Sequence, residues 1–92
     1  MDGTFDRIEA LLEFPCDFPI KVIGQPQPGF EAEIAALVTR HVPAFEATQI
    51  GSTASRRGRY LSLTIEVQVQ DRAQLQSLYQ ALAEHPMVRI VI

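Results

Sequence analysis

The chain has 92 residues, a net charge of −3 at neutral pH and a single cysteine. This length supports one hydrophobic core, so we expect a single domain over residues 1–92. No segment approaches the roughly 20 apolar residues that span a bilayer, and one cysteine excludes an internal disulfide framework. The acidic first seven residues contain no apolar run, which predicts no secretory signal and a cytoplasmic, bacterial-type protein.

The two halves of the chain differ in charge. Residues 1–46 hold eight acidic and three basic side chains, whereas residues 47–92 hold three acidic and five basic side chains. Non-specific binding to nucleic acid depends on several contacts from Lys and Arg to phosphates. The overall acidic balance therefore disfavours nucleic acid as a partner, and we expect no membrane association.

Three segments of the first half show regular patterns. Residues 5–13 have apolar side chains at helical spacing, which predicts a short helix within an N-terminal extension, residues 1–14. Residues 18–24 alternate between two faces and predict the first strand. Residues 30–42 again have apolar side chains at helical spacing and predict the first long helix.

The second half begins with a weak signal and continues with the clearest one. Residues 46–53 are polar and predict an edge strand. Residues 60–70 alternate strictly, which predicts a strand with one buried and one solvated face. Asp71 is typical of a helix N-cap, and Gln74 stands at the position of its capping-box partner. The last strand is predicted over residues 87–92.

The order of these elements is βαββαβ, which predicts an α+β fold, the ferredoxin-like plait. Two right-handed crossovers then place both helices on one face of a four-stranded antiparallel sheet and leave the other face open. We expect the strand over residues 60–70 to be central and the second and fourth strands to lie at the edges. In the fourth strand, Val88, Ile90 and Ile92 are expected to share one face.

No group of residues indicates catalysis, so we expect a protein that is not an enzyme. His41 and His85 lie near the ends of the two long helices, where the helix dipole favours an imidazolium, and we interpret both as helix-terminal residues. Cys16 lies in a predicted loop and is interpreted as an inert thiol. The chain has no His-x-x-x-His motif, cysteine pair or acidic triplet, so we expect no metal and no cofactor.

The loop before the first long helix is one candidate binding site. Glycine at a helix entrance leaves backbone N–H groups accessible, and a helix N-terminus attracts carboxylate or phosphate. We therefore predict that an effector would bind at the loop, and that Gly29→Val would abolish binding with the fold nearly intact unless Gly29 has positive φ. The residues of this predicted site are Gln25, Gln27, Gly29 and Phe30.

A cluster of three arginines is the second candidate. Arg56, Arg57 and Arg59 lie in the turn before residue 60, where Gly58 is free to take positive φ. The cluster is either a solvated tip or a contact for an anion or an acidic partner. Lys21 and Arg89, expected on the open sheet face, would extend this positive surface.

The open face also invites comparison with RNA-recognition domains, which share this topology and stack bases on aromatic side chains. Tyr60 is the aromatic residue expected on that face of the third strand, beside Ser62 and Thr64. One tyrosine is a poor stacking platform. A phosphate- or nucleic-acid-binding plait that uses the arginine tip and the open face therefore stays the alternative function.

Four parts of the chain form a recognisable pattern: Leu11–Pro15, Phe18, Lys21–Gln25 and Val88–Ile92. This pattern resembles the YbeD-like family of short uncharacterised bacterial proteins, and the resemblance covers residues 9–92. It implies a ferredoxin-like fold similar to ACT regulatory domains, without an established activity. The segment from Val22 to Val38 also resembles the ACT pattern of strand, Pro-Gly turn and helix. In ACT domains that turn helps to bind small effectors at a dimer interface.

These observations lead to one main hypothesis. The chain is a non-enzymatic, ACT-like regulatory or protein-interaction module, with a small anionic effector as the expected ligand class. A homodimer or a partner protein would use an edge strand or the open sheet face. Fold alone does not identify the ligand, because sites and not folds determine function.

Overall fold

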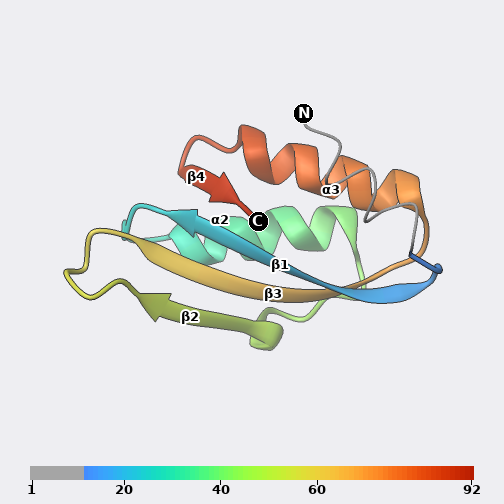
Figure 1. The fold of residues 1–92 in the computed structure, drawn as a ribbon, viewed down its shortest axis with the longest axis horizontal. Coiled ribbons are helices and arrows are strands. Elements are labelled where there is room, and N and C mark those ends of the chain that lie inside the picture. Colours follow the sequence, from blue (N-terminus) through green and yellow to red (C-terminus); the bar gives the residue numbers. More distant parts are fainter. Residues whose placement is uncertain (1–11) are drawn as a thin grey trace.

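The computed structural model describes residues 12–92 (Figure 1). The βαββαβ order and the ferredoxin-like fold are confirmed. The helix predicted over residues 5–13 falls mainly on residues 1–11, outside the described part, and Leu12 and Glu13 are not helical. In chain order, the elements are β1 Cys16–Gly24, α2 Phe30–His41, the 3-10 turn η1 Ala47–Gln49, β2 Ile50–Ala54, β3 Leu61–Val69, α3 Arg72–Glu84 and β4 Val88–Val91.

The four strands form one antiparallel sheet in the order β2-β3-β1-β4. The central position of β3 and the edge positions of β2 and β4 are therefore confirmed. β1 and β3 run side by side through the middle of Figure 1, in a register from Cys16 opposite Val69 to Gly24 opposite Leu61. Every residue of β1 has a partner on β3 in this register, so the two strands form the centre of the sheet.

The core lies between one face of this sheet and the two helices. On β3, Leu63 and Ile65 are fully buried, whereas the alternate residues Thr64 and Glu66 are exposed on the opposite face. Burying an aliphatic side chain stabilises a fold by about 1.5–3 kcal/mol, so this alternation holds the helices to one face. The fully buried side chains with the largest volumes are Phe30, Ile20, Ile34, Leu63, Ile65, Leu75, Leu78, Leu82, Val22, Val38 and Val67.

The second strand is shorter than predicted and begins later. The Glu46 N–H donates to Gln49 Oε1 at 3.0 Å, and the Gln49 N–H donates to the Glu46 carbonyl at 2.9 Å. These bonds close the 3-10 turn η1 over residues that the sequence pattern assigned to the strand. Pairing with β3 therefore starts at Ile50, opposite Ile65, and the prediction of a strand from residue 46 is wrong.

A β-bulge changes the orientation of β4. Ile90 pairs with Ile23 and Val88 with Gly24, so Arg89 is an extra residue between the two pairs. Val88 packs against the core, whereas Ile90 is 53% exposed on the open face. The predicted common face of Val88 and Ile90 is therefore wrong, because the bulge interrupts the strict alternation of the strand.

The start of α3 is joined to the end of α2. Asp71 Oδ1 accepts a hydrogen bond from the Gln74 N–H at 2.8 Å, which confirms the predicted N-cap. The Gln74 side chain does not complete a capping box with Asp71. Its Oε1 accepts from the Gln70 N–H at 2.7 Å, and its Nε2 donates to the His41 carbonyl at 3.0 Å. Gln74 therefore satisfies a terminal carbonyl of α2, which local sequence could not indicate.

The packing around position 24 leaves no room for a side chain, so this position requires glycine. A Cβ at this position would lie 2.6 Å from Phe30 Cζ and closer still to the Met87 carbonyl oxygen. Both neighbours are constrained, since Phe30 is fully buried and the Met87 contact comes from the backbone. The end of β1, the start of α2 and the entrance to β4 therefore meet at a residue without a side chain.

We predict that Gly24→Ala destabilises the protein by about 1–3 kcal/mol, because the added methyl group overpacks this junction. Denaturant unfolding measures the difference in free energy. Gly51→Ala is the matched control, since its Cβ would meet Thr64 only at 3.9 Å, an ordinary contact. Equal stability of the two variants would show that the junction can relax.

The turn between β2 and β3 is held by Ser55. Its Oγ accepts hydrogen bonds from the Arg59 N–H at 3.0 Å and the Tyr60 N–H at 3.1 Å. The Gly58 N–H donates to the Ser55 carbonyl at 2.9 Å, with φ of 67° at Gly58, as the sequence predicts for this glycine. None of these bonds uses an arginine side chain.

We predict that replacing Arg56, Arg57 and Arg59 together with serine changes the free energy of unfolding by less than about 1 kcal/mol. Ser55→Ala is the contrasting variant, because it leaves two backbone donors without their acceptor and should cost more. Thermal and denaturant unfolding compare the two proteins. A larger loss in the triple variant than in Ser55→Ala would mean that the arginine side chains support the fold.

Candidate functional site

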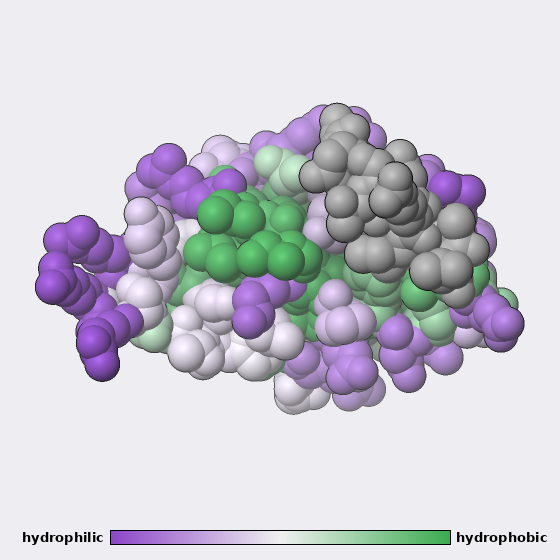
Figure 2. All heavy atoms as spheres, in the orientation of Figure 1, coloured by the Kyte–Doolittle hydropathy of each residue, from purple (hydrophilic) through white to green (hydrophobic). Residues whose placement is uncertain are grey.

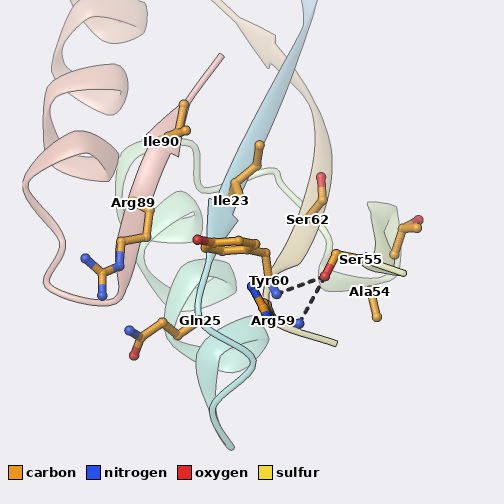
Figure 3. Close-up of a pocket in the computed structure, with 10 residues that line it drawn as sticks. Ile23, Gln25, Ala54, Ser55, Arg59, Tyr60, Ser62, Arg89 and Ile90 are labelled. Atoms are coloured by element: carbon orange, nitrogen blue, oxygen red, sulfur yellow. Dashed lines mark hydrogen bonds between the residues drawn. The ribbon is translucent and has the colours of Figure 1, made fainter. Parts of the chain in front are cut away.

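A hollow of about 720 Å³ lies on the open sheet face, where β1 ends and β3 begins (Figure 3). Its lining comes from all four strands and from the turn that Ser55 organises. The lining residues are Ile23, Gln25, Thr53, Ala54, Ser55, Arg59, Tyr60, Ser62, Arg89 and Ile90.

The strand register builds the floor of this hollow. Ile90 pairs with Ile23, Ile23 with Ser62, and Ser62 with Thr53, so the four residues form one row across the sheet. Residues directly opposite one another in an antiparallel pair project from the same face. The row is therefore apolar at its β4 end and hydroxylated at its β2 end.

The rim of the hollow carries the charged and aromatic groups. Arg89 reaches it because the bulge adds this residue to the open face, and Arg59 comes from the turn before β3. In Figure 3 the Tyr60 ring extends from the turn before β3 across β1 toward the side of Arg89. Tyr60 is 50% exposed, so its ring is available for contact with a ligand.

The electrostatic character of the hollow is positive. Arg59 and Arg89 carry permanent charges, and no Asp or Glu is among the described lining residues. Within residues 12–92 neither arginine has an ion pair with a carboxylate. Two guanidinium groups beside an apolar floor suit a ligand that has both an anionic group and a hydrocarbon or ring portion.

The residues of the predicted loop site do not lie together in the structure. Gln25 lines the hollow, and its Oε1 accepts a hydrogen bond from Gln27 Nε2 at 2.6 Å. Gln27 and Gly29 are exposed on the loop but do not line the hollow. Phe30 is fully buried, so its side chain is a core residue and not a ligand contact. The four residues therefore do not form one surface.

Gly29 has φ of 86°, in the left-handed region that side chains rarely adopt. No atom lies within 4 Å of where its Cβ would be, so the obstacle to substitution is backbone strain and not lack of space. Gly29→Val would consequently lower stability as well as alter the loop. Because Gly29 has positive φ, the Gly29→Val variant cannot test ligand binding separately from folding.

The three arginines also occupy different places. Arg59 lines the hollow, whereas Arg56 and Arg57 are exposed on the turn outside it. The expected position of Arg89 on the open face is confirmed, whereas Ile90 and Ser55 were not expected as neighbours of the arginines. A long-range register and a bulge bring these residues together, and no local signal in the sequence indicates either.

His85 and Cys16 lie outside the hollow. His85 Nδ1 accepts a hydrogen bond from the Met87 N–H at 3.1 Å, and its Nε2 lies 3.7 Å from Glu33 Oε2. Its ring therefore caps the turn after α3 and not the helix carbonyls. Cys16 is the first residue of β1, paired with Val69, so its predicted loop position is wrong.

Outside the hollow, the described part of the chain shows few features that indicate a metal site, an altered pKa or a membrane span. No group of three or more His, Cys, Asp or Glu residues in that part could hold a metal ion. Burial raises the pKa of the Tyr79 phenol above its ordinary value of 10.0, and this residue lies on α3, outside the hollow. None of the helices over residues 12–92 is long and apolar enough to cross a membrane.

Two solved structures have a similar fold. The H. pylori protein HP0495 aligns with a TM-score of 0.74 and 14% identity, over 100% of this chain and 94% of that one. The ACT domain from a GTP pyrophosphokinase of Chlorobium tepidum aligns with a TM-score of 0.62 and 18% identity, over 83% and 84% of the two chains. At these identities the similarity shows the fold alone, which is therefore ACT-like.

Sequence comparison shows closer relationships. A UPF0250 protein of Nitrosomonas europaea is 48% identical over 84 residues, which span 91% of this chain and 97% of that protein. A UPF0250 protein of a Janthinobacterium species is 45% identical over 90 residues, 98% and 99% of the two chains. The sequence profile described as "Protein of unknown function (DUF493)" matches residues 9–92. The chain therefore belongs to the DUF493 family, the YbeD-like or UPF0250 proteins, as its sequence resemblance indicated.

Proposed function

We propose that this protein is a non-enzymatic regulatory or interaction module of the bacterial cytoplasm. In this proposal a small anionic effector binds in the hollow between Arg59 and Arg89. The observation that carries the proposal is the pairing of two guanidinium groups, without a carboxylate among the described lining residues, with an apolar floor.

The chemistry of the lining supports a particular class of ligand. Guanidinium groups bind carboxylates and phosphates through paired, charge-assisted hydrogen bonds. Ile23, Ile90 and the Tyr60 ring offer contact to an aliphatic chain or a planar ring. A volume of about 720 Å³ lies within the usual range for small-molecule sites. The proposed effector is thus an anion of metabolite size with an apolar portion.

The same lining supports binding and not catalysis. Ser, Thr and Tyr hydroxyls can act in general acid–base and nucleophilic catalysis, but as nucleophiles they need an adjacent base to activate them. The described lining has such hydroxyl groups beside guanidinium and amide groups, and no His, Cys, Lys or carboxylate is among them to serve as that base. These groups can orient and neutralise a bound anion, which fits a role as an effector site.

Single-stranded nucleic acid is the second candidate ligand. The observation in its favour is the half-exposed Tyr60 ring beside Arg59 on the open face. RNA-binding plaits stack two or three bases on several aromatic rings, whereas this hollow provides one. The small anion is therefore the preferred ligand, and an oligonucleotide serves as a test of the alternative.

We predict that NMR titration of the labelled protein with phosphate, a medium-chain carboxylate or a nucleoside monophosphate shifts the amide signals of Ile23, Tyr60 and Arg89. For the probe that binds most tightly, Arg59→Ser should weaken binding about tenfold or more, the equivalent of about 1.4 kcal/mol. Arg57→Ser is the matched control, because it removes the same charge from the same turn but not from the hollow.

Three results would contradict this proposal. If Arg57→Ser weakened binding as much as Arg59→Ser, the tip and not the hollow would attract the anion. If all three small anions failed to bind while a short single-stranded oligonucleotide shifted Tyr60 and Thr64, the nucleic-acid alternative would be supported. Shifts confined to residues 25–30 would instead support the loop as the binding site.

A further inference from the structure

The open sheet face has an acidic end opposite its basic end. A second hollow, of about 400 Å³, is lined by Asp17, Glu66 and Gln68 together with residues of the α2–β2 connection. No Lys or Arg is among the described lining residues. Asp17 and Glu66 lie toward the end of the β1–β3 pair that is remote from Arg59, so charge of opposite sign is separated along one face.

Between these two ends, the β4 edge of the face is apolar. Ile90 and Ile92 are 53% and 63% exposed, and Ile23 is the pairing partner of Ile90. Backbone hydrogen bonds of 3.0 and 2.8 Å between Lys21 and Ile92 extend the pairing of β1 and β4 beyond the strand. Figure 2 shows a hydrophobic patch where Figure 1 shows β4 and the C-terminus. Exposed patches of this kind commonly mark interaction surfaces.

We infer that the open face binds the open face of a second copy of this chain. The two sheets pack with their strands antiparallel, about a two-fold axis that runs across the strands near Ile90 and Ile92. This rotation places the basic end of each copy, Arg59 and Arg89, over the acidic end of the other, Asp17 and Glu66. The apolar β4 edge of one copy, with Ile90 and Ile92, then meets the same edge of the other.

Self-complementarity is the reason to prefer a second copy over a different partner. A two-fold interface requires one patch that is complementary to itself after rotation. This face meets that requirement, because its charges have opposite sign at its two ends and its apolar residues lie between them. Lys21 lies in the row of Ile92, and its long aliphatic stem allows its ammonium group to reach solvent at the rim.

The inferred association does not depend on the proposed effector, but effector binding and association would influence each other. In the pair, the partner's Glu66 approaches the same guanidinium groups that a small anion would bind. An anion and a second copy therefore compete for Arg59 and Arg89, and mass action makes each weaken the other. Effector binding would in this way release a monomer with a free sheet face.

Sedimentation equilibrium of the full chain tests the association. The wild type should form a dimer whose dissociation constant rises with salt, because its ends are held by charge pairs. Arg59→Glu and Glu66→Arg should each weaken the dimer at least tenfold, since each places like charges opposite one another. An equimolar mixture of these two variants should restore it, because both contacts of the mixed pair then join opposite charges.

Two further variants complete the design. Arg57→Glu is the control for charge reversal in the same turn and should leave the dimer unchanged. Ile92→Ser should weaken the dimer equally at low and high salt, because it removes apolar contact. A wild type that stays monomeric up to about 1 mM at low salt would overturn the inference. A mixture that fails to restore association, or an Arg57→Glu variant as monomeric as Arg59→Glu, would overturn it as well.

The failure of this inference is distinguishable from the failure of the proposed function. Glu66→Arg leaves the lining of the basic hollow intact, so titration of this variant with phosphate measures anion binding without the competing copy. Phosphate binding by a protein that never dimerises would leave the effector proposal standing alone. Dimerisation without phosphate binding would support the association alone.

Discussion

The rest of the structure depends on the register between β1 and β3. The two strands pair from Cys16 opposite Val69 to Gly24 opposite Leu61, and the alternating residues on one side of both strands are buried. A slip of one residue would move every buried side chain of a strand to the open face. The register therefore decides both which face the helices cover and which polar residues lie on the open face, including Glu66 and Ser62 toward its two ends.

Most features that depend on near neighbours were predictable from the sequence, whereas features that depend on distant partners were not. The turn between Glu46 and Gln49 is an exception, because its bonds are local and the sequence pattern still indicated a strand. The alternation of β3 and the Asp71 cap are local patterns, and both are confirmed. The second role of Gln74, as a donor to the His41 carbonyl, depends on a residue 33 positions away. The bulge beside Gly24 likewise requires β4 to lie against β1, and it reversed the expected orientation of Val88 relative to Ile90.

The same distinction explains what the sequence indicated about the candidate site. The arginine cluster and its turn were predictable from the local sequence, but the sequence does not indicate that Arg59 lines the hollow whereas Arg56 and Arg57 do not. Phe30 was assigned to a ligand site because it begins a helix after Pro-Gly. Its ring instead lies beneath Gly24, since α2 must pack closely against the end of β1. A pattern that marks a helix start does not indicate which way the first side chain points.

The close approach at Gly24 connects the core to the open face. The absence of a side chain lets the Met87 carbonyl lie against Gly24, and the chain enters β4 with Val88 opposite that glycine. The extra residue that follows is Arg89, which the bulge turns toward the hollow while Val88 packs inward. The junction that excludes a methyl group is thus the one that supplies the second guanidinium of the hollow. The packing of the core and the position of the Arg89 guanidinium therefore both depend on the contact between Gly24 and the Met87 carbonyl. Moving this guanidinium would disturb the core.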